Sequence, residues 1–321
     1  MNYLVTILCV TYNHEKYIDD AVRGFLSQKT SFPVKILIGD DASTDSTPQL
    51  LDKYSDIDNI EIIKRSENIG VTRNFKDLSE RIHTKYVALC EGDDYWTDPL
   101  KLQKQVDFME GHPKVTVCFH PSKVVNLDGT ESVYPEPGRD NDYYNEANLK
   151  KTNFMDTASV VYRWKYHEFK HLLPDDFLPL DWIFHLMHAQ YGEVTMLPDI
   201  MSVYRRNPGG VWSSLYSRSW YERFGRAHLN YINFRIRYFD EIPYAYLYFN
   251  ELAYAYVMND KRSSCLKYFR FVYWLRYPWV GRLCSYLCHI VYKVWPFHRL
   301  KLWCKRMAWA LAECARVIPK L

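Results

Sequence analysis

The sequence predicts an α/β fold with a mainly parallel sheet of the doubly wound type, followed by a helical C-terminal region. Apolar, β-rich runs recur through the first 120 residues, and amphipathic helical patterns lie between them. Such runs are typical of strands that helices cover on both faces, and their alternation with helices favours parallel pairing. Beyond residue 215 the pattern is helical. The 321 residues suffice for one large domain, expected over residues 1–215, and a smaller unit over residues 216–321.

The expected elements follow in order along the chain. Residues 4–10 form a continuous β-rich run, and apolar side chains repeat at helical spacing over residues 17–26. Thr47 followed by Pro48 is typical of an N-cap and a first helical position. The same patterns predict strands at 34–38, 60–63, 85–90, 115–120, 159–163, 194–197 and 201–204, and helices at 49–54, 71–82, 99–111 and 180–191. Residues 121–150 are rich in Pro, Asn and Asp, which favours a mobile loop or short excursion. In the C-terminal region helices are expected at 216–239, 243–259, 261–276, 279–294 and 299–317.

The net charge of +3 is distributed unevenly along the chain. Residues 261–321 hold 13 Lys and Arg against one acidic residue, Glu313, and interleave 13 aromatic residues with the basic ones. The rest of the chain has 28 basic against 37 acidic residues. Amphipathic helices of this composition lie in membrane interfaces, so we expect this segment to bind an anionic membrane surface. The alternative is a helical bundle that packs on the first domain or on a second copy of the chain. The acidic first part disfavours nucleic-acid binding.

Cysteine usage and hydropathy indicate the cellular compartment. None of the eight cysteines belongs to a CxxC pair accompanied by a second pair, which disfavours a zinc site. The sequence has no Asn-x-Ser/Thr sequon and no run of 18 uncharged apolar residues, and no basic segment precedes its first apolar run. We therefore expect reduced thiols, no signal peptide and no transmembrane helix. The expected location is the cytoplasm, with peripheral association at the inner face of the plasma membrane.

Polar residues follow three of the expected strands, at the points where the strands end. These segments are Thr11-Tyr12-Asn13, Asp40-Asp41 and Glu91-Gly92-Asp93-Asp94. In doubly wound sheets, ligands bind beyond the carboxyl ends of the strands. The sequence therefore predicts a single site to which all three segments contribute.

These segments resemble motifs of the family 2 glycosyltransferases, which have the GT-A fold, a Rossmann-like, mixed and mainly parallel sheet. The resemblance also includes Asn68-Ile69-Gly70 with Arg73-Asn74, Leu180-Asp181-Trp182 and residues 204–212, and covers about residues 1–215. Each motif is weak alone, but all six in this order on the expected sheet are specific together. The resemblance implies an inverting transferase that moves a sugar from a nucleotide diphosphate, with UDP or dTDP favoured, to a hydroxyl of a glycan or lipid-linked acceptor. By analogy it implies a role in bacterial surface-polysaccharide synthesis.

The segment Glu91-Gly92-Asp93-Asp94 resembles the acidic metal-binding region of that family. Negative charge accumulates on the β-phosphate as the glycosidic bond breaks, and a divalent cation held by carboxylates stabilises this charge. In an extended segment Glu91 and Asp93 point the same way, and Gly92 permits close approach of the backbone. We expect Glu91, Asp93 and Asp94 to hold Mn²⁺ or Mg²⁺, with Asp93 as the favoured ligand. Glu91 stands where Asp is commoner, so its role stays open.

The resemblance places further residues around the nucleotide sugar. Asp40 would accept a hydrogen bond from the base N–H of uracil or thymine, and Arg205 or Arg206 would contact the diphosphate. The other expected contacts are Thr11, Tyr12, Asn13, Asp41, Arg73, Trp96 and Trp212, of which the two tryptophans would be walls for the sugar ring. Each has a structural alternative, because Asp-rich strand ends also suit turns and caps, and tryptophan is mostly buried.

Asp181 matches the position of the family's catalytic base, which takes the proton from the attacking hydroxyl. Inversion needs no covalent intermediate, so one carboxylate suffices. Asp181 could instead cap the helix that follows it. His14, His185 and His188 show no convincing metal-ligand spacing and are expected to be structural or to face solvent.

Two other classes of protein remain as alternatives. Asn207 stands where many relatives have a His that joins the metal shell, and an amide oxygen is a weaker ligand. This leaves open a module that binds nucleotide sugars or glycans without catalysis. A sugar nucleotidyltransferase would need a Gly-rich loop after the first strand, and residues 11–16 contain no Gly. The sequence leaves the oligomeric state open, and a homo-oligomer is compatible with it.

Overall fold

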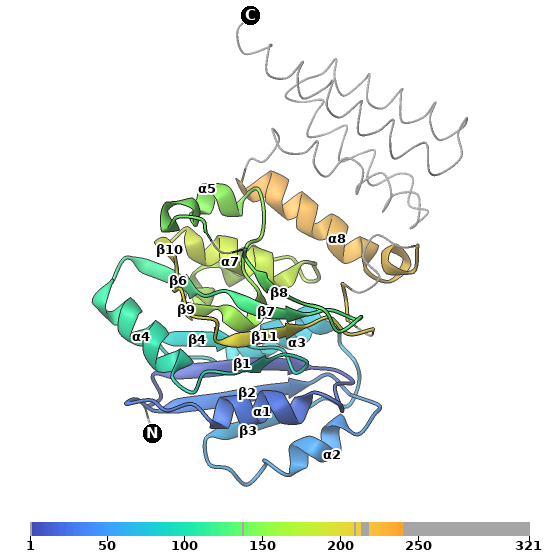
Figure 1. Cartoon of the computed structure of the whole chain (residues 1–321). Coiled ribbons are helices and arrows are strands. Elements are labelled where there is room, and N and C mark those ends of the chain that lie inside the picture. The colour runs from blue at the N-terminus through green and yellow to red at the C-terminus, as the bar shows by residue number, and fades with distance from the viewer. Residues whose placement is uncertain (1, 137, 209, 213–217, 240–321) are drawn as a thin grey trace, which may run out of the picture. The chain divides into compact units, whose positions relative to one another are not determined.

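The computed structural model describes residues 2–136, 138–208, 210–212 and 218–239 (Figure 1). The helices expected at 243–259, 261–276, 279–294 and 299–317, and with them the basic segment 261–321, lie outside the described residues. The chain divides into two compact units, Met1–Asp175 with Pro179–Ser213, and Asp176–Leu178 with Ser214–Leu321. All residues expected at the site belong to the first of these units.

The first unit is built on a seven-stranded sheet with the order β10-β6-β9-β4-β1-β2-β3 (Figure 1). Its strands are β1 (Val5–Thr11), β2 (Val34–Asp40), β3 (Ile60–Lys64), β4 (Tyr86–Leu89), β6 (Val115–Phe119), β9 (Val161–Arg163) and β10 (Glu193–Met196). Adjacent strands are parallel except at β9, which is antiparallel to both β4 and β6. This mixed, mainly parallel sheet confirms the predicted fold class.

Helices cover both faces of this sheet. The longer ones are α1 (Ile18–Leu26), α2 (Thr47–Asp52), α3 (Val71–Glu80), α4 (Lys101–Gly111) and α7 (Leu180–Ala189). Val5, Ile7 and Cys9 of β1 are completely buried and belong to one cluster with side chains of α1 and α4. The side chains that alternate with these along each strand point to the opposite face of the sheet. There a Cβ on Gly39 would lie 2.5 Å from Leu78 of α3, so glycine allows this helix to approach the sheet closely.

A second sheet of four strands has the order β5-β11-β7-β8. It consists of β5 (Tyr95–Trp96), β7 (Ser122–Val125), β8 (Glu131–Tyr134) and β11 (Ser202–Arg205). Residues 121–150, expected as a loop, therefore supply two strands, followed by η1 (Asn141–Tyr143) and α5 (Glu146–Leu149). They are regular structure because β7 pairs with β11, which lies 80 residues further along the chain and leaves no local signal. Three short helices complete the unit, η2 (Thr157–Ser159), α6 (Tyr166–Phe169) and η3 (Lys170–Leu172).

Two helices begin differently from the expectation. Ser46 occupies the N-cap position of α2, and Oγ1 of Thr47 instead accepts a hydrogen bond from the backbone N of His14 at 2.9 Å. Pro179 occupies the N-cap position of α7, so Asp181 lies inside the first turn of that helix. The capping alternative for Asp181 is therefore wrong.

The described part of the second unit comprises α8 (Arg218–Phe239) and the segment Asp176–Leu178. The backbone N of Leu178 donates to the carbonyl oxygen of Ala227 at 3.2 Å, and Nδ2 of Asn230 donates to that of Asp176 at 2.6 Å. The helix expected at 216–239 is thus present. Within the part of the chain that the structure describes, no helix combines the length and the apolar character needed to cross a membrane.

Candidate functional site

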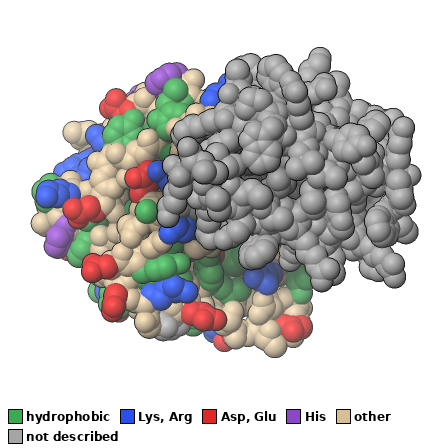
Figure 2. All heavy atoms as spheres, turned by 90° about the horizontal axis from the view of Figure 1, so that it is seen from above, with side chains coloured by type: hydrophobic (Ala, Val, Ile, Leu, Met, Phe, Trp, Pro, Cys, Tyr) green, Lys and Arg blue, Asp and Glu red, His purple; other side chains and the backbone are tan. Residues whose placement is uncertain are grey.

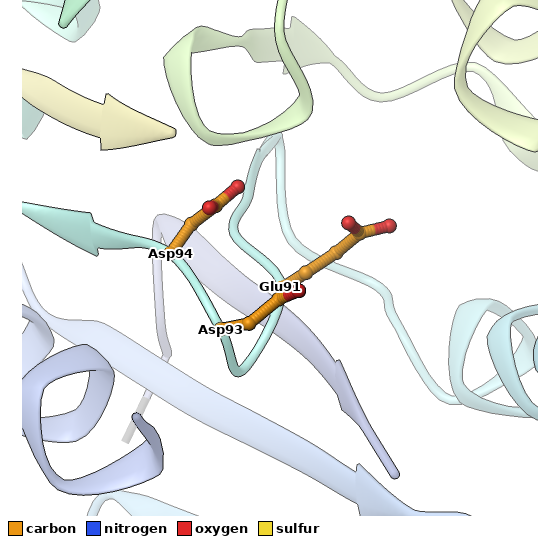
Figure 3. A group of neighbouring side chains, drawn as sticks. All are labelled: Glu91, Asp93 and Asp94. Atoms are coloured by element: carbon orange, nitrogen blue, oxygen red, sulfur yellow. The ribbon is translucent and has the colours of Figure 1, made fainter. Parts of the chain in front are cut away.

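An acidic turn directly follows β4 at the carboxyl edge of the main sheet. The side chains of Glu91, Asp93 and Asp94 leave this one turn (Figure 3), and a carboxylate oxygen from each lies within 4.8 Å of the others. The backbone N of Gly92 donates to the end of β1 at 3.0 Å. A Cβ at position 92 would lie 2.6 Å from Oγ1 of Thr11, so only glycine lets the turn approach β1 this closely. The close approach predicted for Gly92 is confirmed.

Two oxygens of this turn are buried and have no hydrogen-bond partner among the described residues, Oδ1 of Asp93 and Oδ2 of Asp94. The other oxygen of each is bound, since Asp93 accepts from Nδ2 of Asn207 at 2.6 Å and Asp94 from the backbone N of Arg205 at 2.8 Å. A buried acceptor without a partner is costly, at about 1–3 kcal/mol. These two oxygens are therefore positioned for a ligand.

Burial and mutual repulsion disfavour the charged forms of Glu91 and Asp94. Burial, followed by the charges of Asp93, Asp181 and Asp156, raises the pKa of Glu91 to about 8. Burial, followed by the charges of Asp93 and Glu91, raises the pKa of Asp94 well above its ordinary value. Several carboxylates can stay ionised together here only when a positive charge joins them.

This set of donors fits a hard divalent cation. Mn²⁺ and Mg²⁺ prefer carboxylate oxygens, and the unpartnered oxygens of Asp93 and Asp94 are such ligands. Glu91 lies close enough to join them. When bound, a divalent cation stabilises negative charge that develops on a phosphate leaving group. The residues present could therefore hold the ion that the sequence predicts.

Arg205 lies beside the turn and is already engaged by protein groups. Its Nη1 donates to the carbonyl oxygen of Asp93 at 3.2 Å, and its Nη2 lies 2.5 Å from Oδ2 of Asp20. Its guanidinium lies 4.1 Å from the ring centroid of Tyr95. In this arrangement Arg205 holds the acidic turn in place, and the diphosphate contact expected for it stays a prediction. Arg206, the alternative, is exposed.

The loops after β1 and β2 are joined beside this turn. Asp40 ends β2 as the register partner of Thr11, and burial raises its pKa although hydrogen bonds from Ser43 oppose this. Asn13 has a left-handed backbone with φ 57°, and its Oδ1 accepts a backbone hydrogen bond from the loop after β2 at 2.8 Å. Its own backbone N donates to Oγ of Ser43 at 2.8 Å. The structure thus brings Asp40, Thr11 and Asn13 together, and Tyr12 beside them is 43% exposed.

Asp41 and Arg73 have other surroundings. Both carboxylate oxygens of Asp41 accept backbone hydrogen bonds, from the N of Ile69 and of Gly70 at 2.9 Å each. The side chain therefore fixes the loop that leads into α3, and this engagement speaks against the direct nucleotide contact expected for it. Arg73 is exposed on the first turn of α3, and its contact with the base or diphosphate stays a prediction.

Trp96 belongs to the hydrophobic core, contrary to the expectation that it lines the sugar. Its side chain is 4% exposed, and its indole N–H donates to the carbonyl oxygen of Ala158 at 2.9 Å. Its ring packs against Phe25 at 5.0 Å between centroids. β5 turns this side chain inward, toward α1, and a two-residue strand gives no sequence pattern that would show this. Trp212 is half-buried, and its role as a wall for the sugar ring stays a prediction.

Asp181, the candidate base, lies in the first turn of α7. Its Oδ2 accepts a hydrogen bond from Nδ2 of Asn153 at 2.9 Å, and its side chain is 21% exposed. Burial raises its pKa to about 6, against the opposing effect of hydrogen bonds. Its charge also raises the pKa of Glu91, so Asp181 lies close enough to the acidic turn to act on it electrostatically.

Two residues that sequence reasoning did not assign to the site also lie here. Burial, followed by the charge of Asp181, raises the pKa of Asp156 to about 7, although Ser122 and Arg206 oppose this. Oδ2 of Asp156 is buried without a hydrogen-bond partner among the described residues. Nε2 of His14, which we expected to be structural or to face solvent, lies 3.7 Å from Oδ2 of Asp93. A signal for His14 did exist, since it follows the first strand end by three residues.

The fold and the acidic turn define a class of protein, the GT-A fold. Residues 1–349 of TarS from S. aureus, in complex with UDP-GlcNAc, share this fold with 17% identity and a TM-score of 0.54, covering 78% of this chain and 81% of that one. The mannosyltransferase PcManGT of Pyrobaculum calidifontis, in complex with GDP-Man and Mn²⁺, has 15% identity and a TM-score of 0.55, covering 99% and 88%. At these identities the similarity shows the fold alone.

The sequence comparison is more specific. The family model described as Glycosyl transferase family 2 matches residues 6–208. The chain belongs to glycosyl transferase family 2.

Relatives in this family differ in how far they match. A protein of Mycobacterium tuberculosis (strain H37Rv), described as uncharacterized, is 45% identical over 230 residues, which are 70% of this chain and 65% of that protein. The chain thus spans just under two thirds of the length of the mycobacterial relatives it matches. TuaG of Bacillus subtilis, a putative teichuronic acid biosynthesis glycosyltransferase, is 38% identical over 108 residues, 33% of this chain and 42% of TuaG. WfaP of Escherichia coli, a UDP-Glc:alpha-D-GlcNAc-diphosphoundecaprenol beta-1,3-glucosyltransferase, is 34% identical over 107 residues, 33% and 41% respectively.

Proposed function

We propose that this chain is an inverting glycosyltransferase. It moves a sugar from a nucleotide diphosphate, UDP or dTDP in the favoured case, to a hydroxyl of a glycan or lipid-linked acceptor. The observation that carries this proposal is the acidic turn after β4, where buried oxygens of Asp93 and Asp94 have no partner among the described residues. The turn lies beside the adjacent ends of β1 and β2, which hold Thr11 and Asp40.

On the donor side, residues at different strand ends would bind different parts of the nucleotide sugar. Asp40 would accept the imide N–H of uracil or thymine, with Thr11 and Tyr12 against the base. Glu91, Asp93 and Asp94 would hold Mn²⁺ or Mg²⁺, which neutralises the charge of the leaving diphosphate. The complexes of TarS with UDP-GlcNAc and of PcManGT with GDP-Man and Mn²⁺ support this use of the fold, in those proteins.

On the acceptor side, Asp181 would act as the general base. With a pKa of about 6, it is ionised at neutral pH and more basic than an ordinary aspartate. The acceptor oxygen bonds to the anomeric carbon, its proton goes to Asp181, and the bond from that carbon to the β-phosphate oxygen breaks. The electron pair of that bond leaves with the nucleoside diphosphate. A single displacement of this kind inverts the configuration at the anomeric carbon.

The biological setting is proposed from the relatives. TuaG is described as a putative teichuronic acid biosynthesis glycosyltransferase, and the name of WfaP states a diphosphoundecaprenol-linked acceptor. These names support a role in bacterial surface-polysaccharide synthesis and an acceptor carried on a lipid. Such an acceptor would bring the chain to the inner face of the plasma membrane.

Peripheral membrane binding is proposed for residues 261–321, which lie outside the described residues. On the face drawn in Figure 2, the described Lys and Arg side chains are interspersed with Asp and Glu, so this part of the surface offers no continuous basic band. The proposal therefore depends on the 13 basic residues of that segment. The full chain should sediment with anionic liposomes at low salt and be released at high salt. Absence of salt-sensitive binding would favour a helical bundle instead.

The test of the proposed activity is release of nucleoside diphosphate by the full chain. UDP-sugars and dTDP-sugars are supplied with Mn²⁺, Mg²⁺ or EDTA, and Asp93→Ala is compared with Asp175→Ala, whose side chain is 99% exposed. Cation-dependent release that Asp93→Ala abolishes and Asp175→Ala retains is expected. A thermal-shift screen of nucleoside diphosphates identifies the base, since a ligand of the folded state raises the melting temperature. Binding without release would indicate a module without catalysis, and pyrophosphate release from a nucleoside triphosphate with a sugar 1-phosphate would indicate a nucleotidyltransferase.

A further inference from the structure

A buried histidine lies behind Asp181 on the same helix. His185 follows Asp181 by one helical turn, and its side chain is completely buried. Its Nδ1 lies 2.6 Å from the phenol oxygen of Tyr162 in β9. Its Nε2 lies 3.9 Å from Oδ2 of Asp181 and has no hydrogen-bond partner among the described residues. The imidazole thus connects the core to the candidate base.

The protonation state of this imidazole follows from its surroundings. Burial, followed by repulsion from His188, lowers the pKa of His185 to about 3, so the ring is neutral at physiological pH. Burial raises the pKa of Tyr162 well above its ordinary value, so the phenol keeps its proton. A neutral imidazole carries one proton, and the hydrogen bond at one nitrogen decides which nitrogen holds it.

Only one of the two tautomers suits both neighbours. If Tyr162 donates to Nδ1, the proton of His185 is on Nε2 and faces the carboxylate of Asp181. The opposite tautomer would direct the lone pair of Nε2 at that carboxylate, which is repulsive. The electrostatics therefore favour Tyr162 as the donor and Nε2–H as the group that faces Asp181.

The distance from Nε2 to Asp181 shows that this contact is not closed in the free protein. At 3.9 Å it exceeds a hydrogen bond, whereas Asn153 already donates to the same Oδ2 at 2.9 Å. A shift of about 1 Å would bring Nε2–H to hydrogen-bond distance. Catalytic hydrogen bonds are often long in free enzymes and tighten when substrate binds.

We propose that His185 is a positioning residue, whose neutral imidazole, fixed by Tyr162, donates Nε2–H to Asp181 and orients that carboxylate toward the acceptor hydroxyl. This role rests on the proposed function of Asp181 as base. His185 itself neither gains nor loses a proton. The proton of the hydroxyl goes to Asp181, while Asn153 and His185 hold Oδ2 from two sides.

A purely structural role is the competing explanation, and the chain offers a matched control for it. His188 lies on the same helix and is also completely buried. Its ring stacks on Tyr162 at 4.1 Å between centroids, and its Nδ1 donates to the carbonyl oxygen of Phe184 at 2.8 Å. Replacing His188 removes a buried imidazole of the same helix without removing the group that faces Asp181.

The experiment compares steady-state kinetics of the full chain and four variants. His185→Leu should lower kcat about 10- to 100-fold with the donor KM unchanged, because a misplaced base costs rate rather than binding. His185→Gln places an amide N–H near the position of Nε2 and should restore most of kcat. Tyr162→Phe removes the hydrogen bond that fixes the tautomer of His185 and should lower kcat by a smaller factor. His188→Leu should keep kcat within about twofold. Equal losses in His185→Leu and His188→Leu, without rescue by Gln, would overturn the proposal.

The pH dependence of kcat distinguishes a positioning role of His185 from a purely structural one. A donor to the carboxylate favours its charged form, so its loss in His185→Leu should shift the acidic limb of kcat to higher pH. Among the described residues, Asn153 and His185 lie beside the carboxylate of Asp181, and Glu91, Asp156, Tyr134 and Tyr162 interact with its charge; all but His185 stay the same in this variant. An unshifted limb would contradict the proposal.

A measurement without turnover separates this proposal from the proposed function. The ¹⁵N chemical shifts of the His185 ring in the wild-type chain report which nitrogen carries the proton. Protonated Nε2 at neutral pH is expected, and protonated Nδ1 or a doubly protonated ring would overturn the role of His185 whether or not the chain transfers a sugar. If Nε2 is protonated but Asp181→Asn retains full activity, the proposed base is wrong and the positioning role falls with it.

Discussion

The side-chain amide of Asn207 donates a hydrogen bond of 2.6 Å to Oδ2 of Asp93. Asn207 follows β11 in the second sheet, and Asp93 follows β4 in the main sheet, so this bond joins the two sheets at the acidic turn. An amide nitrogen that donates to Asp93 orients that carboxylate and leaves its other oxygen for a ligand. Position 207 therefore supports the turn, whereas the sequence suggested only a weakened metal ligand there.

Asn207→Ala should lower the affinity for Mn²⁺ about tenfold, because groups that orient a metal-binding side chain typically contribute this much. The measurement is a Mn²⁺ titration followed by calorimetry, in the presence of a nucleoside diphosphate. Asn126→Ala is the control, since the hydrogen bonds of Asn126 to described residues stay within the turn between β7 and β8. Unchanged affinity in Asn207→Ala would show that Asp93 needs no such support.

Gly92→Ala should both destabilise the chain and reduce activity. The added Cβ would lie 2.6 Å from Oγ1 of Thr11 and 2.9 Å from Nδ1 of His14, so the acidic turn must move away from β1. Overpacking of this kind costs about 1–3 kcal/mol, and displacement of the turn should lower kcat at least about tenfold. Gly111→Ala is the matched control, because no described residue outside its own helix backbone and chain neighbours lies within 4 Å of its Cβ position. Urea unfolding and donor turnover are measured for both, and an active, equally stable Gly92→Ala would contradict the geometry.

Much of the main sheet could be predicted because its signals are local. The apolar run of β1 and the helical spacing of α1 are visible in the sequence, and their observed bounds differ from the expected ones by about one residue. β7 and β8 could not be predicted in this way, since a partner distant in sequence stabilises them. The N-cap of α7 could not be predicted from the sequence either, because Pro179 occupies this position without a side-chain hydrogen bond.

The candidate site shows the same division. Asp40 and the acidic turn follow parallel strands, so the rule that ligands bind at carboxyl ends finds them. Asp156 precedes β9, which is antiparallel to β4, and it therefore reaches this edge from the start of a strand. The rule that ligands bind at the carboxyl ends of strands therefore does not predict Asp156. Trp96 was misassigned because the sequence next to an acidic motif does not show which face of a two-residue strand is buried.

Glu91→Gln should retain more activity than Asp93→Asn. Burial and neighbouring charges already disfavour the charged form of Glu91, and the amide oxygen of Gln keeps a possible ligand atom at this position. Asp93 offers a buried, unpartnered oxygen to the site, and its loss should lower kcat at least about 100-fold. Nucleoside diphosphate release is the assay, with cation concentration varied for each variant. Equal loss in the two variants would mean that Glu91 is also a required ligand.

The rate should fall in acid with an apparent pKa near 6. Asp181 has a pKa of about 6 because of burial, and only its deprotonated form accepts the proton of the acceptor. Below this pH, kcat should decrease about tenfold for each pH unit, and above it kcat should level off. Asp181→Asn should lower kcat by about 10²- to 10⁴-fold while nucleoside diphosphate binding persists. A limb near pH 4, the range of an exposed aspartate, would argue against this residue as the base.

The buried amine of Lys101 should make the free energy of unfolding depend on pH. Lys101 begins α4 and is completely buried, with Nζ 2.8 Å from Oε1 of Gln105 and 4.3 Å from the ring centroid of Trp96. Burial lowers its pKa to about 7, whereas an unfolded chain has a lysine pKa of about 10.4. Between these values the unfolded state binds a proton that the folded state lacks. The contribution of Lys101 to the free energy of unfolding therefore increases from pH 7 to pH 10 and is lowest below pH 7.

Lys101→Met should consequently raise the melting temperature by about 3 °C at pH 6.5, and the gain should shrink or reverse at pH 9. At pH 6.5 the variant removes a buried charge, whereas at pH 9 it removes a neutral amine and leaves Oε1 of Gln105 without its donor. Lys104→Met is the control, because Asp199 and Asp98 raise the pKa of Lys104 and its loss should not stabilise the chain at either pH. Melting curves followed by circular dichroism decide the point. An equal shift at both pH values would mean that Lys101 keeps the same protonation state in the folded and unfolded chain, so that burial does not lower its pKa.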